Sequence, residues 1–171
     1  MGLCKYLTHL YKSAKQPVKY YRSLGMKIGE GCEIYASAQF GSEPYLITLG
    51  NHVRVTDNVK FVTHDGGLWV ARDLNKEYAD ADKFGKITVG DNVHIGPNTI
   101  IMPGVNIGSN CIIGCGAVVT RDIPNNSVAV GVPAKVIETV DEYIAKNKDS
   151  FTHTKNMTPQ QKREYLNKNL R

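Results

Sequence analysis

The sequence predicts an all-β fold, a parallel β-helix of short strands flanked by short helices. The first observation behind this prediction is a six-residue period, because every sixth residue from position 89 to position 119 is a β-branched aliphatic. A six-residue step turns through about 600° at 3.6 residues per turn, so residues six apart would not lie on one face of an α-helix. The second observation is that Gly, Asn and Pro recur at fixed offsets within the six-residue units, which a simple alternating strand does not need. The aliphatic positions are Val89, Ile95, Ile101, Ile107, Ile113 and Val119.

The repeat also predicts how the coils are built. Each aliphatic points inward, the fifth residue of each unit is smaller because the turn brings it near the axis, and three units make one triangular coil. Successive coils stack at about 4.8 Å and satisfy each other's backbone hydrogen bonds. The coils begin at Ile28, Leu49, Val89 and Ile107, at intervals of 21, 40 and 18 residues.

Two of these intervals are longer than the 18 residues of a regular coil. The excess is three residues near 41–44 and about 22 residues between 66 and 87. Both insertions follow the third unit of a coil, so both leave from the same corner of the prism. Insertions in repeat proteins gather on the binding face, which makes this corner the first functional indication.

The segment before the first coil is basic and amphipathic. Residues 3–13 and 16–24 predict two short helices interrupted at Pro17. They would either cap the open first coil or touch an anionic membrane surface, and we favour capping because the apolar residues would cover an exposed end. Those residues are Leu3, Leu7, Leu10 and Tyr11.

The segment after the last coil predicts two further helices. The first covers residues 139–148. The second begins at Thr158, with Pro159 in its first turn and Gln161 three residues after the cap, and runs to about residue 170. We therefore expect a helical cap (1–26), a β-helix domain (27–138) with a loop insertion (66–86), and a helical extension (139–171).

Composition restricts the class of protein. The 171 residues carry a net charge of +5, but residues 1–29 hold +6, residues 30–134 hold −4 and residues 135–171 hold +3. The basic balance therefore belongs to the ends, and no nucleic-acid-binding motif accompanies it. Four Cys show no zinc spacing, and no apolar run is long enough for a transmembrane helix. We expect a cytoplasmic protein, with weak contact between residues 1–24 and the inner membrane face as the alternative role of that segment.

The last coil carries a resemblance to a known family. The stretch from Ile113 to Ile137, IGCGAVVTRDIPNNSVAVGVPAKVI, follows a long array of hexads and resembles the ending of hexapeptide-repeat acyltransferases. These include galactoside, maltose, serine, xenobiotic and polysaccharide acetyltransferases. The resemblance covers roughly residues 26–138, and FVTHDGG at 61–67 with SEP at 42–44 is most similar to the O-acetyltransferases of capsular and other surface polysaccharides. It implies a left-handed β-helix and a homotrimer that binds acetyl-CoA between neighbouring subunits. It also implies that no metal is required.

His64 is the predicted general base. Acetyl transfer to a hydroxyl needs a group that takes the proton as the oxygen attacks, and a neutral His does this near pH 7. His64 is the fourth residue of the last unit before the long insertion, so it lies at the shared corner, where the family places its catalytic His. Its partner stays open, since either the adjacent Asp65 or a backbone carbonyl could orient the ring.

The candidates for acceptor binding are Glu43, Asp65, Trp69 and His94. Glu43 lies in the short insertion at the same corner, where it either hydrogen-bonds acceptor hydroxyls or serves structure. Trp69, the sole Trp, lies in the long insertion and would pack on a neighbour, stack on a sugar or adenine, or pack on its own coil. His94 stands where many relatives carry Trp, and we favour a structural or acceptor-site role for it over catalysis.

The resemblance also implies where acetyl-CoA binds. Glycines in the turns of the later coils would let the backbone approach the pantetheine arm and offer it amides, and Thr120 and Arg121 match the family's pair near the phosphates, as Lys135 also could. We interpret Cys115 as a small wall residue, not a nucleophile, and Cys32 and Cys111 as core residues. The candidate turn residues are Gly96, Pro97, Gly114, Cys115 and Gly116.

Three functions are compatible with these residues. The first is O-acetylation of a sugar or a cell-surface polysaccharide precursor, by direct attack without an acyl-enzyme. The second is N-acetylation of a nucleotide-linked amino sugar, which would use the same base. The third is a non-catalytic trimeric binding protein, which the presence of His64 beside an intact family ending disfavours. A carbonic-anhydrase version of the fold would need three zinc His, and His64 and His94 have no evident third.

Overall fold

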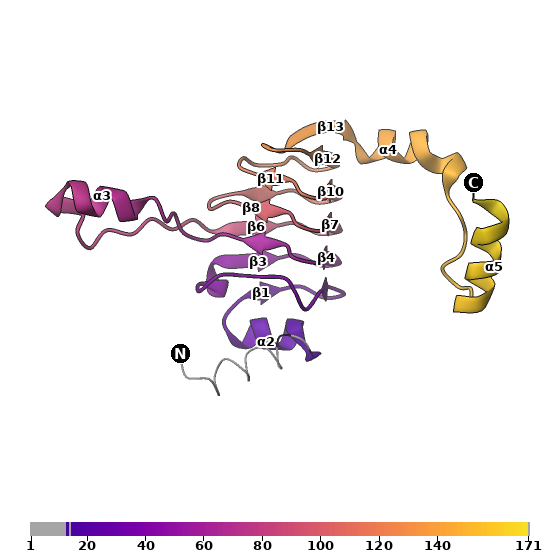
Figure 1. Cartoon of the computed structure of the whole chain (residues 1–171), viewed down its shortest axis with the longest axis horizontal. Helices are drawn as coiled ribbons and strands as arrows, with labels where there is room; N and C mark the ends of the chain where they lie inside the picture. The colour runs from indigo at the N-terminus through magenta and orange to yellow at the C-terminus, as the bar shows by residue number, and fades with distance from the viewer. Residues whose placement is uncertain (1–12, 14, 171) are drawn as a thin grey trace.

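The computed structural model describes residue 13 and residues 15–170, and its body is a prism of stacked coils (Figure 1). Each full coil gives one short strand to each of three sheets, which we call A, B and C. Every strand pair is parallel except β12–β13, so the predicted parallel β-helix is confirmed. The strand orders are β1-β3-β6-β9 in sheet A, β13-β12-β10-β7-β4-β2 in sheet B and β11-β8-β5 in sheet C.

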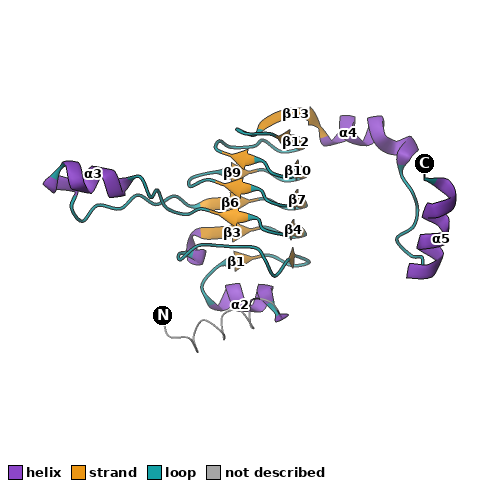
Figure 2. Cartoon of the chain, viewed as in Figure 1, coloured by secondary structure: helices purple, strands orange, loops and turns teal. Residues whose placement is uncertain are grey.

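The elements are short, as a coil with three corners requires (Figure 2). The strands are β1 Lys27–Ile28, β2 Glu33–Ile34, β3 Ile47–Leu49, β4 Val53–Val55, β5 Lys60–Phe61, β6 Ile87–Val89, β7 Val93–Ile95, β8 Ile100–Ile101, β9 Asn106–Ile107, β10 Cys111–Ile113, β11 Val118–Val119, β12 Ser127–Val130 and β13 Lys135–Thr139. The helices are α2 Pro17–Ser23, η1 Pro44–Leu46, α3 Leu68–Leu74, η2 Lys76–Tyr78, α4 Val140–Asn147, η3 Lys148–Ser150 and α5 Pro159–Asn169.

The register of sheet A confirms the predicted coil starts. Ile28 pairs with Leu49, Leu49 with Val89, and Val89 with Ile107. The six aliphatics that define the period are at most 2% exposed. The fifth residues of the same units are buried too, from Thr99 at 0% to Ile123 at 5%. The predicted inward positions therefore form one continuous core along the axis of the prism.

Turns between strands explain much of the Asn content. Six non-glycine residues have φ between 55° and 60°, a left-handed conformation that Asn tolerates better than most side chains. His52 takes this turn position, and its Nδ1 lies 2.9 Å from the Oδ1 atom of Asn92 in the next coil. A structural role for His52 in the turn follows from both facts. The six residues are His52, Asn58, Asn92, Asn98, Asn110 and Asn126.

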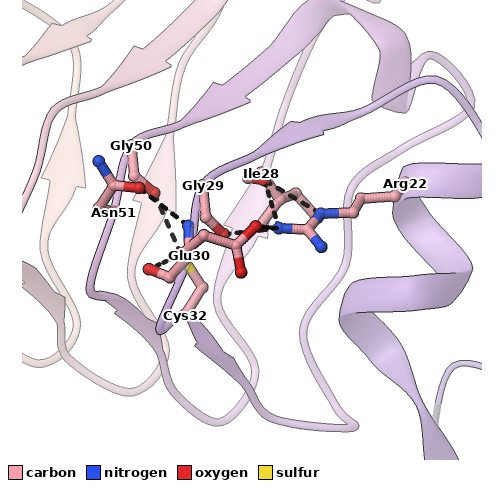
Figure 3. A network of polar contacts seen from close by, with 7 residues as sticks. All are labelled: Arg22, Ile28, Gly29, Glu30, Cys32, Gly50 and Asn51. Carbon is pink, nitrogen blue, oxygen red and sulfur yellow. Dashed lines mark hydrogen bonds and ion pairs between the residues drawn. The ribbon is translucent and has the colours of Figure 1, made fainter.

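Helix α2 covers the open side of the first coil, as predicted for residues 16–24, while the helix predicted at 3–13 lies outside the described residues apart from Ser13. Tyr21 is 6% exposed, and the centroid of its ring lies 4.4 Å from that of the Phe40 ring. The Arg22 guanidinium donates to the backbone oxygens of Ile28 and Gly29 at 2.7–3.0 Å and to the Glu30 carboxylate at 2.9 Å (Figure 3). These contacts support the capping role for this part of the N-terminal segment.

Near the same end, Cys32 is only partly buried, and its Sγ donates to the Gly50 oxygen at 3.1 Å (Figure 3). It therefore contributes less to the core than predicted. Cys111, which is 1% exposed, is the core residue expected.

The C-terminal end of the prism is covered by β13, which pairs antiparallel with β12. Helices α4 and α5 follow, close to the positions predicted from the sequence. Both start with a capping box, Thr139 with Glu142 and Thr158 with Gln161, the second as the sequence indicated. No helix among residues 13 and 15–170 is long and apolar enough to cross a membrane.

Candidate active site

The long insertion leaves the corner between sheets C and A as an arm, residues 66–86, that projects far from the prism (Figure 1). The sequence predicted a loop here, but the arm contains the helix α3 and the turn η2. Trp69 lies on α3 and is 79% exposed. Leu74 on the same helix is 80% exposed, so the arm presents apolar side chains to solvent in the isolated chain.

The root of the arm holds His64 in place. The Asp65 amide donates to the Lys83 oxygen, and the Gly85 amide to the Thr63 oxygen, each at 2.9 Å. His64 and Phe84 form an antiparallel bridge between these two bonds, and their rings meet edge to face with centroids 6.2 Å apart. The backbone of His64 is thus fixed by a short ladder where the arm begins and ends.

Glu43 is the partner of His64. Its Oε2 atom lies 3.2 Å from His64 Nδ1, and it accepts a 2.7 Å hydrogen bond from the Thr63 hydroxyl. The Glu43 side chain is 15% exposed and that of His64 47%, so the pair sits at the surface with the carboxylate beneath. The sequence placed both residues at this corner but did not pair them. The available signal was their spacing of 21 residues, the length of the first coil.

The chemistry of Glu43 fixes the orientation of the imidazole. Hydrogen bonds from the hydroxyls of Ser42 and then Thr63 hold the pKa of Glu43 below its usual value, so the group is ionised at neutral pH. An ionised carboxylate only accepts hydrogen bonds, so His64 Nδ1 carries the proton that it donates to Glu43. The unprotonated nitrogen of the neutral ring is then Nε2, the atom a general base needs.

Asp65, the partner weighed from the sequence, is turned to the arm. Its carboxylate accepts from the Gly67 amide at 2.9 Å and from Lys83 Nζ at 3.1 Å. The Gly67 bond, with Lys83 second, lowers the pKa of Asp65. Asp65 therefore helps to close the root of the arm, and the contact to the His64 ring comes from Glu43.

His94 does not join this site within one chain. It lies on β7 in sheet B, across the prism from the corner between sheets C and A, with Arg54 and Ile112 as its strand neighbours. Burial, and then the charge of Arg54, lower the pKa of His94. It lines a small pocket of about 190 Å³ that also includes His52 and Lys155. The structure thus separates His94 from His64, Glu43 and Asp65.

The amides of the glycines proposed for CoA binding are hydrogen-bonded within the β-helix. The amides of Gly96, Gly114 and Gly116 donate to backbone oxygens of other turns or strands at 2.8–2.9 Å. A Cβ on Gly96 would lie 2.7 Å from the Cys115 amide nitrogen, and one on Gly114 would lie 2.7 Å from Val130 Cγ1. Coil stacking therefore requires glycine at 96, while at 114 an added Cβ would press on the Val130 side chain, and the three amides are not free for a pantetheine carbonyl.

The remaining CoA candidates are on the outer surface of the last coils. Cys115, Thr120, Arg121 and Lys135 are exposed, and Pro97 has no amide hydrogen to offer. The Ala134 amide donates to the Val118 oxygen, so the segment just before Lys135 lies against β11, which leads to Arg121. No group of three His, Cys, Asp or Glu suited to a metal occurs in the described part of the chain.

The comparisons with known proteins agree with this architecture. The bacterial transferase hexapeptide family (six repeats) matches residues 86–121. Protein CapG of Staphylococcus aureus is 46% identical over 147 residues, which cover 85% of this chain and 84% of CapG. The chain belongs to the hexapeptide-repeat transferase family. This membership implies the left-handed sense expected for the β-helix.

Two acetyltransferases are also similar to the chain. Galactoside O-acetyltransferase of Escherichia coli K12 is 39% identical over 123 residues, which cover 71% of this chain and 59% of the relative. The crystal structure of a maltose O-acetyltransferase from Clostridium difficile 630 matches with a TM-score of 0.59 and 28% identity, over 80% of this chain and 83% of that one. The chain is thus an enzyme of the acetyltransferase class, as the sequence indicated.

Proposed function

We propose that the chain is an acetyl-CoA-dependent O-acetyltransferase that acts on a hydroxyl of a sugar or a cell-surface polysaccharide precursor. The observation that supports it best is the hydrogen-bonded pair of Glu43 and His64 at the root of the arm. The pair supplies an oriented base in a family whose named relatives acetylate galactosides and maltose. In this proposal residues 27–138 are the catalytic body, residues 1–26 the cap and residues 139–171 an extension.

The reaction needs one base and no covalent intermediate on the enzyme. The acceptor oxygen attacks the thioester carbonyl carbon while its proton passes to His64 Nε2. The tetrahedral intermediate collapses, the C–S bond breaks, and the same proton passes from His64 to the sulfur of CoA. Glu43 stabilises the imidazolium formed between these steps, because its negative charge lies 3.2 Å from Nδ1.

Glu43→Gln tests this positioning role. The amide of Gln can donate to Nδ1 and so favour the tautomer with the proton on Nε2, which cannot act as a base. We expect kcat to fall by about 10-fold to 100-fold, with a smaller change in KM for the acceptor. The matched control is Glu33→Gln, which removes another carboxylate, paired with Arg54 at 2.8 Å on sheet B. An equal loss of kcat in both variants would contradict a specific role for Glu43.

Acetyl-CoA is assigned to the last coils on the strength of the family resemblance. Arg121 and Lys135 are exposed bases that would pair with its phosphates, with Thr120 beside them. The structure favours side chains over turn amides for this contact, because the amides of Gly96, Gly114 and Gly116 are already bonded within the coil. Pro97 and Cys115 would contribute shape to the wall.

The exposed apolar residues of the arm favour a homotrimer in which the arm packs against a neighbouring subunit. Trp69, Val70 and Leu74 are 59–80% exposed on one short helix, an apolar surface that is costly to leave in water. We expect the double substitution Trp69→Ala and Leu74→Ala to shift the sedimentation coefficient from trimer toward monomer and to lower activity. Phe151→Ala removes an aromatic that is 47% exposed in the C-terminal extension and should leave the trimer intact. A double variant that sediments like the wild type would remove the arm from the interface.

The direct test of the function is an acceptor panel. Thiol release from acetyl-CoA would be measured with galactosides, maltose and amino sugars as acceptors, and the products would be identified by mass spectrometry. O-acetylated products would support the proposal. Preferred acetylation of an amine would instead establish the N-acetyltransferase alternative. If none of the acceptors supports thiol release and calorimetry detects no binding of acetyl-CoA, the non-catalytic binding protein would be favoured.

A further inference from the structure

The end of the prism at which the first coil lies carries an unbalanced positive charge. Residues 1–29 contain six Lys and Arg and no acidic residue, whereas residues 30–134 carry a net charge of −4. The described part of this end is α2 together with β1, the outermost strand of sheet A (Figure 1). We call it the basic end and define it by three exposed lysines, Lys15, Lys19 and Lys27.

The first two acidic residues of the chain do not neutralise these lysines. Glu30 pairs with Arg22 at 2.9 Å, and Glu33 pairs with Arg54 at 2.8 Å. Lys19 and Lys27 form no ion pair with any residue among 13 and 15–170. Their charges are therefore available to a partner outside the chain.

The cap holds Lys19 on a fixed support. The inner side of the cap is committed to the core, where Tyr21 is 6% and Met26 3% exposed. The Arg22 guanidinium binds the backbone oxygens of Ile28 and Gly29, which fastens α2 to the first coil. Closing the coil and presenting positive charge to solvent are thus two roles of the same short helix.

Exposed apolar side chains accompany the basic end. Leu24, directly after α2, is 40% exposed, and Tyr45 is 60% exposed. Tyr45 lies beside this turn, because a Cβ built on Gly25 would be 3.0 Å from Tyr45 Cβ. A Tyr combines an apolar ring with a polar hydroxyl, which suits it to the boundary between water and lipid. Basic and apolar side chains together complement a bilayer, which offers both anionic headgroups and acyl chains.

We propose that the basic end docks the prism end-on onto a bilayer that contains anionic lipids. A flat surface contacts only the end of the prism, whereas an extended polyanion such as DNA or RNA would also run along the body, whose charge of −4 repels it. In the proposed trimer, threefold symmetry brings three copies of the basic end to the same height along the axis. A plane can then touch all three at once, which strengthens binding through avidity.

The test is co-sedimentation of the whole chain with sucrose-loaded vesicles. Vesicles of phosphatidylcholine alone are compared with vesicles that contain an equal amount of phosphatidylglycerol, at about 0.1 M salt, where the Debye length is about 10 Å. We expect binding to the anionic vesicles only. The double substitution Lys19→Gln and Lys27→Gln should weaken this binding by about tenfold or more, because one lysine near an anionic surface strengthens binding by about fivefold.

Two further variants make the result specific. Lys162→Gln with Lys168→Gln removes two exposed lysines from α5, in the other basic part of the chain, and lowers the net charge equally. This control should bind anionic vesicles like the wild type, as should Lys19→Arg with Lys27→Arg, which keeps the charge. An equal loss in the two Gln variants, or equal binding of the wild type to both kinds of vesicle, would overturn the inference.

A competition experiment separates a bilayer from a nucleic acid. Duplex DNA is added to vesicle-bound protein at an equal concentration of phosphate. Retention on the vesicles would support the proposal, whereas displacement by DNA would overturn it and assign the basic end to nucleic acid. Because docking is measured without acetyl-CoA or an acceptor, a failure of the proposed acetyl transfer would leave this result unaffected.

Discussion

Replacing His64 by alanine is expected to lower kcat for acetyl transfer by a factor of about 10²–10⁴, the usual contribution of a general base. The substitution removes Nε2, the atom that would take the acceptor proton. It leaves the coil core intact, because the His64 side chain is 47% exposed. Binding of acetyl-CoA should persist, since its proposed contacts lie on the last coils. The measurement is thiol release at saturating substrates, with calorimetry of acetyl-CoA on the same variant.

Two other histidines make this result specific. His153→Ala changes an exposed residue of the C-terminal link and should leave kcat unchanged. His94→Ala tests the rival base, which lies on sheet B away from the arm. Activity retained by the His64 variant and lost by the His94 variant would reverse the assignment. Loss of activity in both the His64 and the His94 variant would indicate that the face of sheet B contributes to the active site of a neighbouring subunit.

The coil could be predicted from the sequence because its rule is local. A residue every six positions must be large and apolar and the fifth must be smaller, so the pattern is visible in the sequence alone. The corner proposed for the active site came from the same arithmetic, since insertions of different length keep the coils in register. His64 was singled out in this way because it is the fourth residue of the last unit before the arm.

The partner of His64 shows where this reasoning stops. Glu43 reaches the ring from the coil below, and its role depends on a side-chain direction that no period encodes. The nearer carboxylate in the sequence, Asp65, is drawn off by the Gly67 amide and Lys83. The short helix α3 was missed for a related reason, because seven residues with an exposed apolar side carry little periodic signal.

Glycine was the ambiguous signal at the proposed CoA site. A glycine in a turn is compatible both with a bound ligand and with a close approach of the backbone of another coil. At Gly96 the second reason suffices, because a Cβ there would lie 2.7 Å from the Cys115 nitrogen. Only the stacking of the coils, which places residues 96 and 115 together, separates the two explanations.

The same stacking predicts a large loss of stability for Ile101→Ala. Ile101 is fully buried, and its Cα partners in sheet C are Phe61 on one side and Val119 on the other. The neighbouring coils cannot close on the vacancy, because backbone hydrogen bonds hold them at about 4.8 Å along the axis. We therefore expect the free energy of unfolding to fall by about 3–5 kcal/mol, the upper part of the range for buried aliphatics.

The position of a buried residue along the prism should decide how much it contributes to the free energy of unfolding. Ile28 is 8% exposed and has a strand partner on one side only, Leu49, so α2 can settle into the space left by Ile28→Ala. The free energy of unfolding should therefore fall by less in Ile28→Ala, about 2 kcal/mol. Ile137→Ala, at a site 58% exposed, should cost less than about 0.5 kcal/mol. Urea unfolding at one fixed protein concentration tests this order, since oligomerisation couples stability to concentration. Equal losses for Ile101 and Ile28 would mean that the inner coils relax as freely as the capped end, and that the coil spacing does not limit repacking.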